Sequence, residues 1–344
     1  MSLDNEKPDV ALVAYDTLGD GLIYLMVAEN LCLNGFEVTF FGKQIADLRE
    51  WLPQFRVERY STEQDLESEL GRHDLVLYSP PSFVRQTRSP DDMQRLAERY
   101  VLICNSPHIP DYWRYDHTKR IKNELPPEKA RKLLGLADCG GCMRHRKFGR
   151  ENVVEIALAY MKERMQLENV TKDVRLKVPD GLKHRRYRRR IVISPDSASP
   201  GRKDWDPARF LALADRIAAR GYDPRIVVAP ANHQEWKTMP GNTYETPKFL
   251  SIAELAAFLY ESGAVVANDS GNGHLASFLR VPTITIHRGL KPRYPWRPGW
   301  GPGTIVCPTI ALSLFRRRLW RPFVPVAKIL REIDRYCSDQ PAPS

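Results

Sequence analysis

The stretch VVANDSGNGHLASFLRVPTITIH, residues 265–287, decides the fold of this chain. It begins with an apolar, β-branched run, becomes polar at NDSGNGH, and returns through LASFLRVP to a second β-branched run. This pattern predicts a strand, a tight loop, a short helix and another strand. Such a junction places the unpaired N–H groups of a helix N-terminus at the end of a strand, which suits a phosphate group.

The same alternation of strands and helices recurs along the chain in two halves. The first half has apolar strand-like runs at 9–16, 37–42, 74–79 and 100–105, and the second at 190–195, 225–230, 264–269 and 283–287. The segments between them have helical spacing, at 20–34, 90–99, 151–167, 206–220, 251–262 and 272–279. The pattern predicts two parallel-sheet α/β domains, Rossmann-like, facing a central cleft. Neither half carries a complete G-x-G-x-x-G or a P-loop motif, which disfavours NAD enzymes and P-loop nucleotidases.

We expect the domains to divide as follows. An N-terminal domain covers 1–170 and includes a long loop region at 106–150, where Pro, His, Tyr and Arg are frequent and periodicity is weak. A basic linker covers 171–190, a C-terminal domain 191–323, and a helix with a tail 324–344.

Composition indicates a cytoplasmic globular protein. Of the 344 residues, 42% are hydrophobic and 27% charged, as in soluble domains. The start, MSLDNEKPDV, lacks the apolar centre of a signal peptide, and no run approaches the roughly 18 apolar residues of a membrane span. The six cysteines do not form a disulfide pattern. Cys139 and Cys142 stand in a C-G-G-C, which we interpret as reduced thiols, because a structural zinc site needs four ligands.

The formal net charge of +10 is concentrated in two stretches. KHRRYRRR, residues 183–190, contains six Lys or Arg, and FRRRLWRPF, residues 315–323, mixes four Arg with apolar side chains. Basic residues beside bulky apolar ones suit an anionic membrane surface. Solvated charge on a linker and a helix flank explains them equally well, so both interpretations stay open.

The first strand leads into the loop of VAYDTLGDGLIY, residues 13–24. Gly19 and Gly21 permit a sharp turn and the close approach of another molecule. Asp20 falls at the start of a helix, where the dipole keeps its carboxylate ionised and able to accept a proton. The alternative is that Asp20 is a plain helix N-cap.

Two further loops carry polar residues towards the expected cleft. In SPDSASPGRKDWDPARF, residues 194–210, Ser199 and Lys203 lie after a strand and before a helix, which suits a diphosphate, although a solvated lysine is the alternative. In the opening stretch, Ser270 and Gly271 present a hydroxyl and N–H groups to a phosphate. Asp269 is placed to accept hydrogen bonds from sugar hydroxyls, and His274 faces the same region.

At these places the chain resembles glycosyltransferase family 9, the ADP-heptose:lipopolysaccharide heptosyltransferases, which have the GT-B fold. The resemblance rests on the Gly-Asp pair, the KDWDPARF segment and the NDSGNGHLASFLRVPT segment, and covers roughly 10–335. It implies that Asp20 is the general base, with Gly19 and Gly21 on the acceptor side. It also implies that the N-terminal domain takes the acceptor and the C-terminal domain binds the nucleotide-sugar, with Glu235 at the nucleoside. The residues that bind the donor would be Ser199, Lys203, Glu235, Asp269, Ser270, Gly271 and His274.

The resemblance implies an inverting, metal-independent transfer without a cofactor. A sugar, most simply heptose from ADP-heptose, would move onto a lipopolysaccharide core or related glycan, with peripheral contact at the inner membrane and no nucleic acid partner. The chain departs from the family in two places. No Arg precedes the first loop, and HRGLKPRYPWRPGW, residues 287–300, stands where a Gly-Pro-Thr-like turn is usual. A transferase or epimerase using another nucleotide-sugar, and a non-catalytic basic protein that binds glycan or nucleic acid, remain as alternatives.

Overall fold

The chain folds into two units, each built on a parallel β-sheet. The computed structural model describes residues 7–80, 88–105, 113–144, 149–197, 201, 203–292, 294–314 and 317–338. Unit 1 consists of Met1–Gly149 with Val154–Pro179, and unit 2 of Arg150–Val153 with Asp180–Ser344. The predicted fold class, parallel α/β in both halves, is confirmed.

Unit 1 has a six-stranded sheet in the order β3-β2-β1-β4-β5-β6. Its strands are β1 (Asp9–Val13), β2 (Glu37–Gly42), β3 (Arg56–Arg59), β4 (Leu75–Tyr78), β5 (Val101–Cys104) and β6 (Gly141–Cys142). All the pairings between them are parallel. Because parallel strands end at the same edge, the residues after β1, β4 and β5 come together there.

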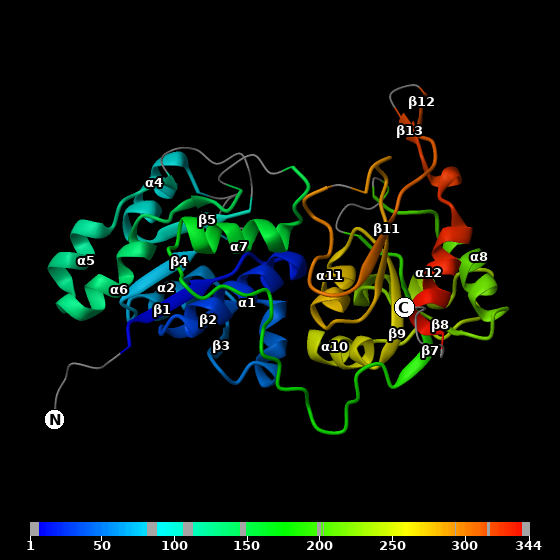
Figure 1. Cartoon of the computed structure of the whole chain (residues 1–344), viewed down its shortest axis with the longest axis horizontal. Helices are drawn as coiled ribbons and strands as arrows, with labels where there is room; N and C mark the ends of the chain where they lie inside the picture. The colour runs from blue at the N-terminus through cyan, green and yellow to red at the C-terminus, as the bar shows by residue number, and fades with distance from the viewer. Residues whose placement is uncertain are drawn as a thin grey trace. The chain divides into compact units, whose positions relative to one another are not determined.

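Helices cover both faces of this sheet (Figure 1). Side chains of α2 (Glu63–Leu70) and α4 (Pro90–Arg99) pack on one face in a single apolar cluster with Ala11 and Val13. Strand residues alternate between faces, so Leu12 points to the other face, where α1 (Leu18–Leu33) is buried over most of its length. The 3₁₀ helix η1 (Gln44–Trp51) follows β2, and α7 (Val153–Glu163) precedes the long crossover to unit 2.

The prediction of a long loop at 106–150 is wrong for the part of it that the structure describes. Residues 118–137 form two helices, α5 (Thr118–Glu124) and α6 (Pro127–Ala137), before β6. Helix α6 buries Ala130, Leu133 and Leu136 at a spacing of three residues, with Pro127 at its first turn. The high Pro and Arg content concealed this short apolar stripe. Residues 106–112 and 145–148 lie outside the described part.

Residues 168–177 form an extended strap that is hydrogen-bonded to α1, within unit 1 (Figure 1). Asn30 donates to the Thr171 carbonyl at 2.8 Å and accepts from its N–H at 2.7 Å. Asn34 Oδ1 accepts the N–H of Glu168 at 3.0 Å. Glu29 is fully buried and is held by Gln54 Nε2 at 2.6 Å and by the Arg175 guanidinium. Polar side chains therefore hold the strap, and it completes unit 1.

Unit 2 has a five-stranded parallel sheet in the order β11-β10-β9-β7-β8. The strands are β7 (Tyr187–Ser194), β8 (Asp223–Ile226), β9 (Ser262–Asn268), β10 (Thr283–Ile286) and β11 (Gly303–Val306). One face packs against α8 (Pro207–Ala218) and α12 (Val326–Cys337) through an apolar cluster. Two further helices, α10 (Ile252–Tyr260) and α11 (Gly271–Phe278), pack against strand β9 of the same sheet.

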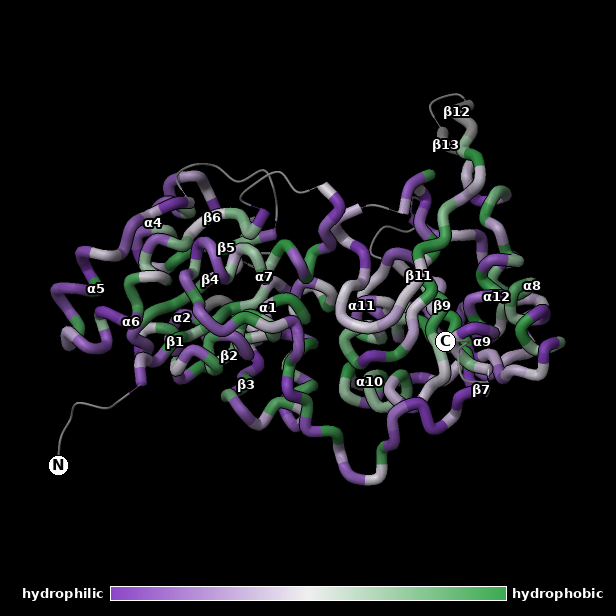
Figure 2. The backbone as a smooth tube through the Cα atoms, viewed as in Figure 1, coloured by the Kyte–Doolittle hydropathy of each residue, from purple (hydrophilic) through white to green (hydrophobic). Residues whose placement is uncertain are grey.

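The remaining elements of unit 2 are short. They are η3 (Pro230–Asn232), α9 (His233–Lys237), the hairpin of β12 (Leu312–Leu314) and β13 (Arg317–Leu319), and η4 (Arg321–Phe323). The basic residues 187–190, expected in a linker, form the first half of β7, and Figure 2 shows this hydrophilic run leading into the hydrophobic half of the strand. Residues 227–230, expected in a strand, follow β8 as a loop and the start of η3.

Candidate functional site

The predicted base, Asp20, lies in the first turn of α1. The N-cap of this helix is Thr17, and Asp20 is its third residue. The alternative that Asp20 itself is the N-cap is therefore wrong. The Thr17 hydroxyl donates to Asp20 Oδ2 at 2.5 Å, and the Asn105 side-chain amide donates to Asp20 Oδ1 at 3.0 Å. Both oxygens of the carboxylate are thus held, which fixes its orientation at the edge where β1 and β5 end.

The two glycines beside Asp20 differ in their surroundings. Gly21 is buried, and a Cβ built on it would lie 3.1 Å from Ile45 Cβ. Its lack of a side chain therefore serves the packing of α1 against η1. Gly19 is half-buried in the first turn, where the N–H groups of a helix have no intrahelical acceptor.

In unit 2, Lys203 and Asp269 form an ion pair, with Nζ and Oδ2 2.8 Å apart. Asp269 directly follows β9, and Lys203 lies in the loop after β7. The sequence predicted that both residues bind the donor, and the structure brings them together. Their side chains are 27% and 12% exposed, so the pair is accessible but shielded enough to interact strongly with a further charge.

The loop that carries Lys203 is braced through Trp205 by two residues, Asn268 and Arg321, whose role here the sequence did not indicate. Asn268 is fully buried; its Oδ1 accepts the Trp205 N–H at 3.2 Å, and its amide donates to the Pro195 carbonyl. The Arg321 guanidinium donates to the Asp204 carbonyl at 2.6 Å, and its own carbonyl accepts from Trp205 Nε1 at 2.8 Å. These contacts fix the backbone on both sides of the lysine.

Helix α11 begins directly after Asp269, with Ser270 as its N-cap. The Ser270 side chain makes no capping hydrogen bond, and its hydroxyl is buried without a partner in the described part of the chain. Gly273 lies against β9, because a Cβ on it would be 3.4 Å from the Ala267 Cβ. Gly271, with no side chain, opens the helix. Within the described part of the chain the hydroxyl therefore has no acceptor, and the first N–H groups of the helix have none inside the helix.

His274 lies in α11 with only 4% of its surface exposed. Its ring packs edge-on against Trp296 and Trp300, at 5.9 and 6.3 Å between centroids. Burial lowers the pKa of His274 to about 4, although the charge of Asp269 opposes this shift. The imidazole is therefore neutral at pH 7, and its Nδ1 is buried without a partner among the described residues.

Glu235, the predicted nucleoside contact, is exposed in α9. The loop before it is held by Asp196, which accepts the Ala229 N–H at 2.5 Å and the Asn232 amide at 3.0 Å. Burial raises the pKa of Asp196, and these hydrogen bonds oppose the shift. Ser199 lies outside the described residues.

The two cysteines of the C-G-G-C are buried free thiols. Burial raises the pKa of Cys139 to about 12, which makes it an inert thiol near neutral pH. Among the described residues, no group of three or more His, Cys, Asp and Glu side chains is placed to hold a metal ion. None of the helices in the described ranges is long and apolar enough to span a bilayer.

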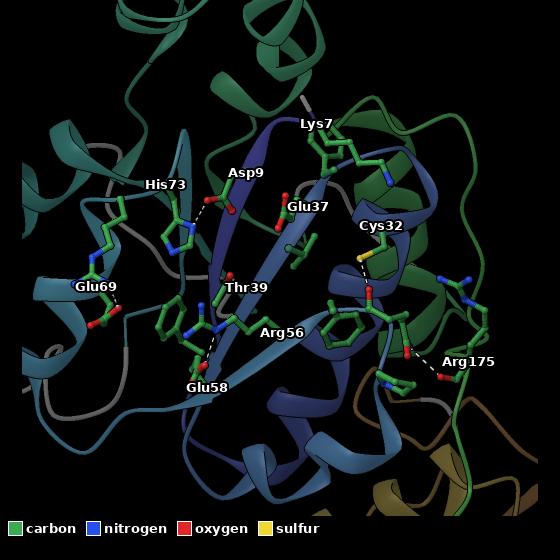
Figure 3. A pocket seen from close by; sticks show the side chains of 17 residues that line it. Lys7, Asp9, Cys32, Glu37, Thr39, Arg56, Glu58, Glu69, His73 and Arg175 are labelled. Atoms are coloured by element: carbon green, nitrogen blue, oxygen red, sulfur yellow. Dashed lines mark hydrogen bonds and ion pairs between the residues drawn. The ribbon is translucent and has the colours of Figure 1, made fainter. Parts of the chain in front are cut away.

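A cavity of about 900 Å³ lies elsewhere in unit 1, around the amino ends of β1 and β2 (Figure 3). Its lining shares no residue with the predicted site. Most of its charges are already paired internally, as Arg56 with Glu58 at 2.6 Å and His73 with Asp9 at 2.9 Å. Volume alone therefore does not identify the functional site here.

The two comparisons by sequence point to one family. Residues 143–306 match the family described as Glycosyltransferase family 9 (heptosyltransferase). Lipopolysaccharide heptosyltransferase 1 of Pseudomonas aeruginosa is 34% identical over 96 residues, or 27% of each protein. The match thus spans little more than a quarter of this curated relative.

Solved structures are similar over a much larger share of the chain. The ADP-heptose lipopolysaccharide heptosyltransferase II of E. coli has a TM-score of 0.60 at 14% identity, over 96% of this chain and 98% of its own. The glycosyl transferase family 9 protein of Veillonella parvula has a TM-score of 0.57 at 15% identity, over 89% and 87%. At these identities the likeness is one of fold. The predicted resemblance is confirmed: residues 143–306 of this chain are similar to glycosyltransferase family 9, and the chain has a GT-B type fold, similar to that of a heptosyltransferase over nearly its whole length.

Proposed function

We propose that this protein is an inverting, metal-independent glycosyltransferase that moves heptose from ADP-heptose onto a lipopolysaccharide core or a related glycan. The family match and the fold support the reaction class. The choice of donor is supported by the E. coli heptosyltransferase WaaC, a structure of similar fold with a TM-score of 0.53 that was solved with ADP. We place the reaction in the cytoplasm.

One observation carries the proposal: the N-terminus of α11. There the buried Ser270 hydroxyl, which has no partner among the residues that the structure describes, stands beside the Lys203–Asp269 pair. A diphosphate satisfies these groups together, because its oxygens accept from a hydroxyl, an ammonium and helix N–H groups. A neutral ligand would leave the lysine charge without a second acceptor.

In the proposed reaction, the acceptor hydroxyl attacks the anomeric carbon on the face opposite the diphosphate. A new carbon–oxygen bond forms, the bond to the phosphate oxygen breaks, and Asp20 takes the hydroxyl proton. Lys203 and the first N–H groups of α11 stabilise the negative charge that develops on the leaving diphosphate. Asp269 accepts hydrogen bonds from the sugar.

The proposal is tested by titrating the protein calorimetrically with ADP-, UDP- and GDP-sugars, followed by identification of the product. We expect ADP-heptose to bind most tightly and a glycosylated acceptor to form. A free epimerised nucleotide-sugar as the product identifies an epimerase instead. Failure of every nucleotide-sugar to bind, with retention of nucleic acid on a filter at physiological salt, indicates the basic binding protein.

We also propose that the basic stretches contact the inner membrane. Arg186, Arg188 and Arg189 are exposed in and beside β7, and each charge near an anionic surface contributes about 1 kcal/mol. Arg316 lies outside the described residues. Reversing Arg186 and Arg188 to Glu is expected to weaken binding to anionic vesicles at low salt. Unchanged binding assigns these arginines to solvated charge.

A further inference from the structure

Two stacked rings, His287 and Tyr294, border the ion pair in unit 2. Ile286 of β10 is the register partner of Asn268 on β9. His287 directly follows Ile286, and Asp269 directly follows Asn268. His287 and Asp269 therefore lie side by side at the ends of two adjacent parallel strands. The Tyr294 ring lies on His287, with centroids 3.7 Å apart and planes within 6°. Both rings are thus placed next to Asp269.

The charge of Asp269 acts on both rings. Burial raises the pKa of Tyr294 well above its ordinary value, and the Asp269 carboxylate raises it further. Burial lowers the pKa of His287, and Asp269 opposes that shift. Both rings are therefore neutral at pH 7. Because the Gly289 N–H donates to His287 Nδ1 at 3.2 Å, the ring proton lies on Nε2.

The Tyr294 hydroxyl is buried and has no hydrogen-bond partner in the part of the chain described. Such a group calls for an explanation, since buried hydroxyls are nearly always paired. The segment that carries it is fixed: Arg297 Nη1 donates to the Tyr294 carbonyl at 3.0 Å, and Ser277 Oγ of α11 accepts the Trp300 N–H at 3.2 Å. The hydroxyl is thus held in place without a partner of its own.

We propose that Tyr294, supported by His287, binds a hydroxyl group of the transferred sugar beside Asp269. This inference rests on the proposed function and adds a specificity-determining residue to it. A neutral phenol both donates and accepts, as a sugar hydroxyl does, whereas diphosphate oxygens only accept. In the proposed function, Lys203 and the N-terminus of α11 bind the diphosphate. His287 and Tyr294 both belong to the stretch in which the sequence departs from the Gly-Pro-Thr-like turn usual in the family.

The test is Tyr294→Phe, which removes only the hydroxyl and keeps the stacked ring. Wild type and variant are titrated with ADP-heptose and with ADP. We expect the affinity for ADP-heptose to fall about three- to tenfold, as for the loss of one neutral hydrogen bond, and that for ADP to stay the same. Tyr222→Phe is the matched control, because its hydroxyl donates to Asp334 of α12 at 3.2 Å; we expect neither affinity to change.

The other outcomes overturn the inference in distinguishable ways. Equal losses for both ligands assign Tyr294 to the nucleotide or to the integrity of the loop. No loss for either ligand removes Tyr294 from the site. If the wild type binds neither ADP nor ADP-heptose, the proposed function fails first, and the role of Tyr294 in sugar binding fails with it.

Discussion

The functional residues of unit 1 and unit 2 differ in how far the protein itself satisfies them. In unit 1 both oxygens of the Asp20 carboxylate already accept hydrogen bonds, from Thr17 and Asn105. In unit 2 the hydroxyl of Ser270 and that of Tyr294 are buried without partners among the described residues. A group that is already oriented suits a chemical step, whereas buried polar groups without partners suit a ligand that supplies the missing bonds.

Because of this difference, we expect turnover and donor affinity to depend on different residues. Changes at Asp20 are expected to alter turnover and leave donor binding intact, and changes in the loops of unit 2 are expected to do the reverse. The following experiments test that separation.

The largest effect is expected for Asp20→Asn. The amide keeps the size of the side chain but cannot take a proton, so turnover should fall by about 10²–10⁴. Donor affinity, measured by titration, should stay unchanged. Asp65→Asn is the matched control, since Asp65 holds the same third position in α2, where it is bonded to the N-cap Thr62. Near-normal turnover of the Asp20 variant excludes the carboxylate as the base.

The second-largest effect is expected on the free energy of unfolding and depends on His274, which is buried in α11. The pKa of His274 is lowered to about 4 in the folded protein and lies near 6.5 in the unfolded chain. Between these values the unfolded state binds more protons, so the free energy of unfolding decreases on acidification through this window, by up to about 3 kcal/mol. The loss should be smaller in His274→Gln, as measured by denaturation at pH 7 and pH 4.5.

The comparison with His274→Gln isolates one group, because the other histidines with lowered pKa are present in both proteins. Equal acid sensitivity of the two proteins contradicts a neutral, buried His274.

Lys203→Ala is expected to weaken nucleotide-sugar binding by about 1.5–3 kcal/mol, the range for hydrogen bonds to charged groups. Binding of the nucleoside alone should change little, because it lacks the diphosphate. Lys248→Ala, which removes an exposed lysine of the same unit, serves as the control. An equal loss for nucleoside and nucleotide-sugar places Lys203 away from the diphosphate.

The smallest effect is expected for Ser270→Ala. This change should not lower the stability of the free protein, but it should weaken the binding of the nucleotide-sugar. Removing a buried hydroxyl that has no partner should leave the melting temperature of the free protein unchanged or higher. Affinity for the nucleotide-sugar should fall by about 0.5–1.5 kcal/mol, since the ligand loses one hydrogen bond. A lower melting temperature with unchanged affinity gives Ser270 a structural role instead.

The sequence predicted the strands and the long helices because their signals are local. The β-branched runs around 265 and 283 and the polar break between them fixed β9, α11 and β10 without knowledge of the rest. Helix α6 was missed because its apolar stripe is short and lies among charged residues. The strands β3, β6, β11, β12 and β13 were also missed. β6 has only two residues, and β3 and β11 each bury a single side chain, so they lack the continuous apolar run that marks the predicted strands.

The site was predictable as a set of residues but not as a set of contacts. Asp20, Lys203 and Asp269 stand in recognisable patterns. The partner of Asp20, Asn105, is 85 residues away along the chain, and only the order of the strands brings β1 and β5 to one edge. His287 and Tyr294 carry no motif, and their stacking becomes visible only when the register of β9 and β10 is known.

The strap at 168–177 has a consequence for how the protein is made. Glu29 and Asn30 are fully buried in α1, and their partners Arg175 and Thr171 are more than 140 positions further along the chain. A nascent chain that ends at 149 holds every strand of the first sheet, but the Glu29 carboxylate then has the neutral Gln54 amide and lacks its charged partner Arg175. Removing the partner of a buried charge is strongly destabilising. The first unit can therefore reach its full stability during translation only after residues 168–177 have also left the ribosome.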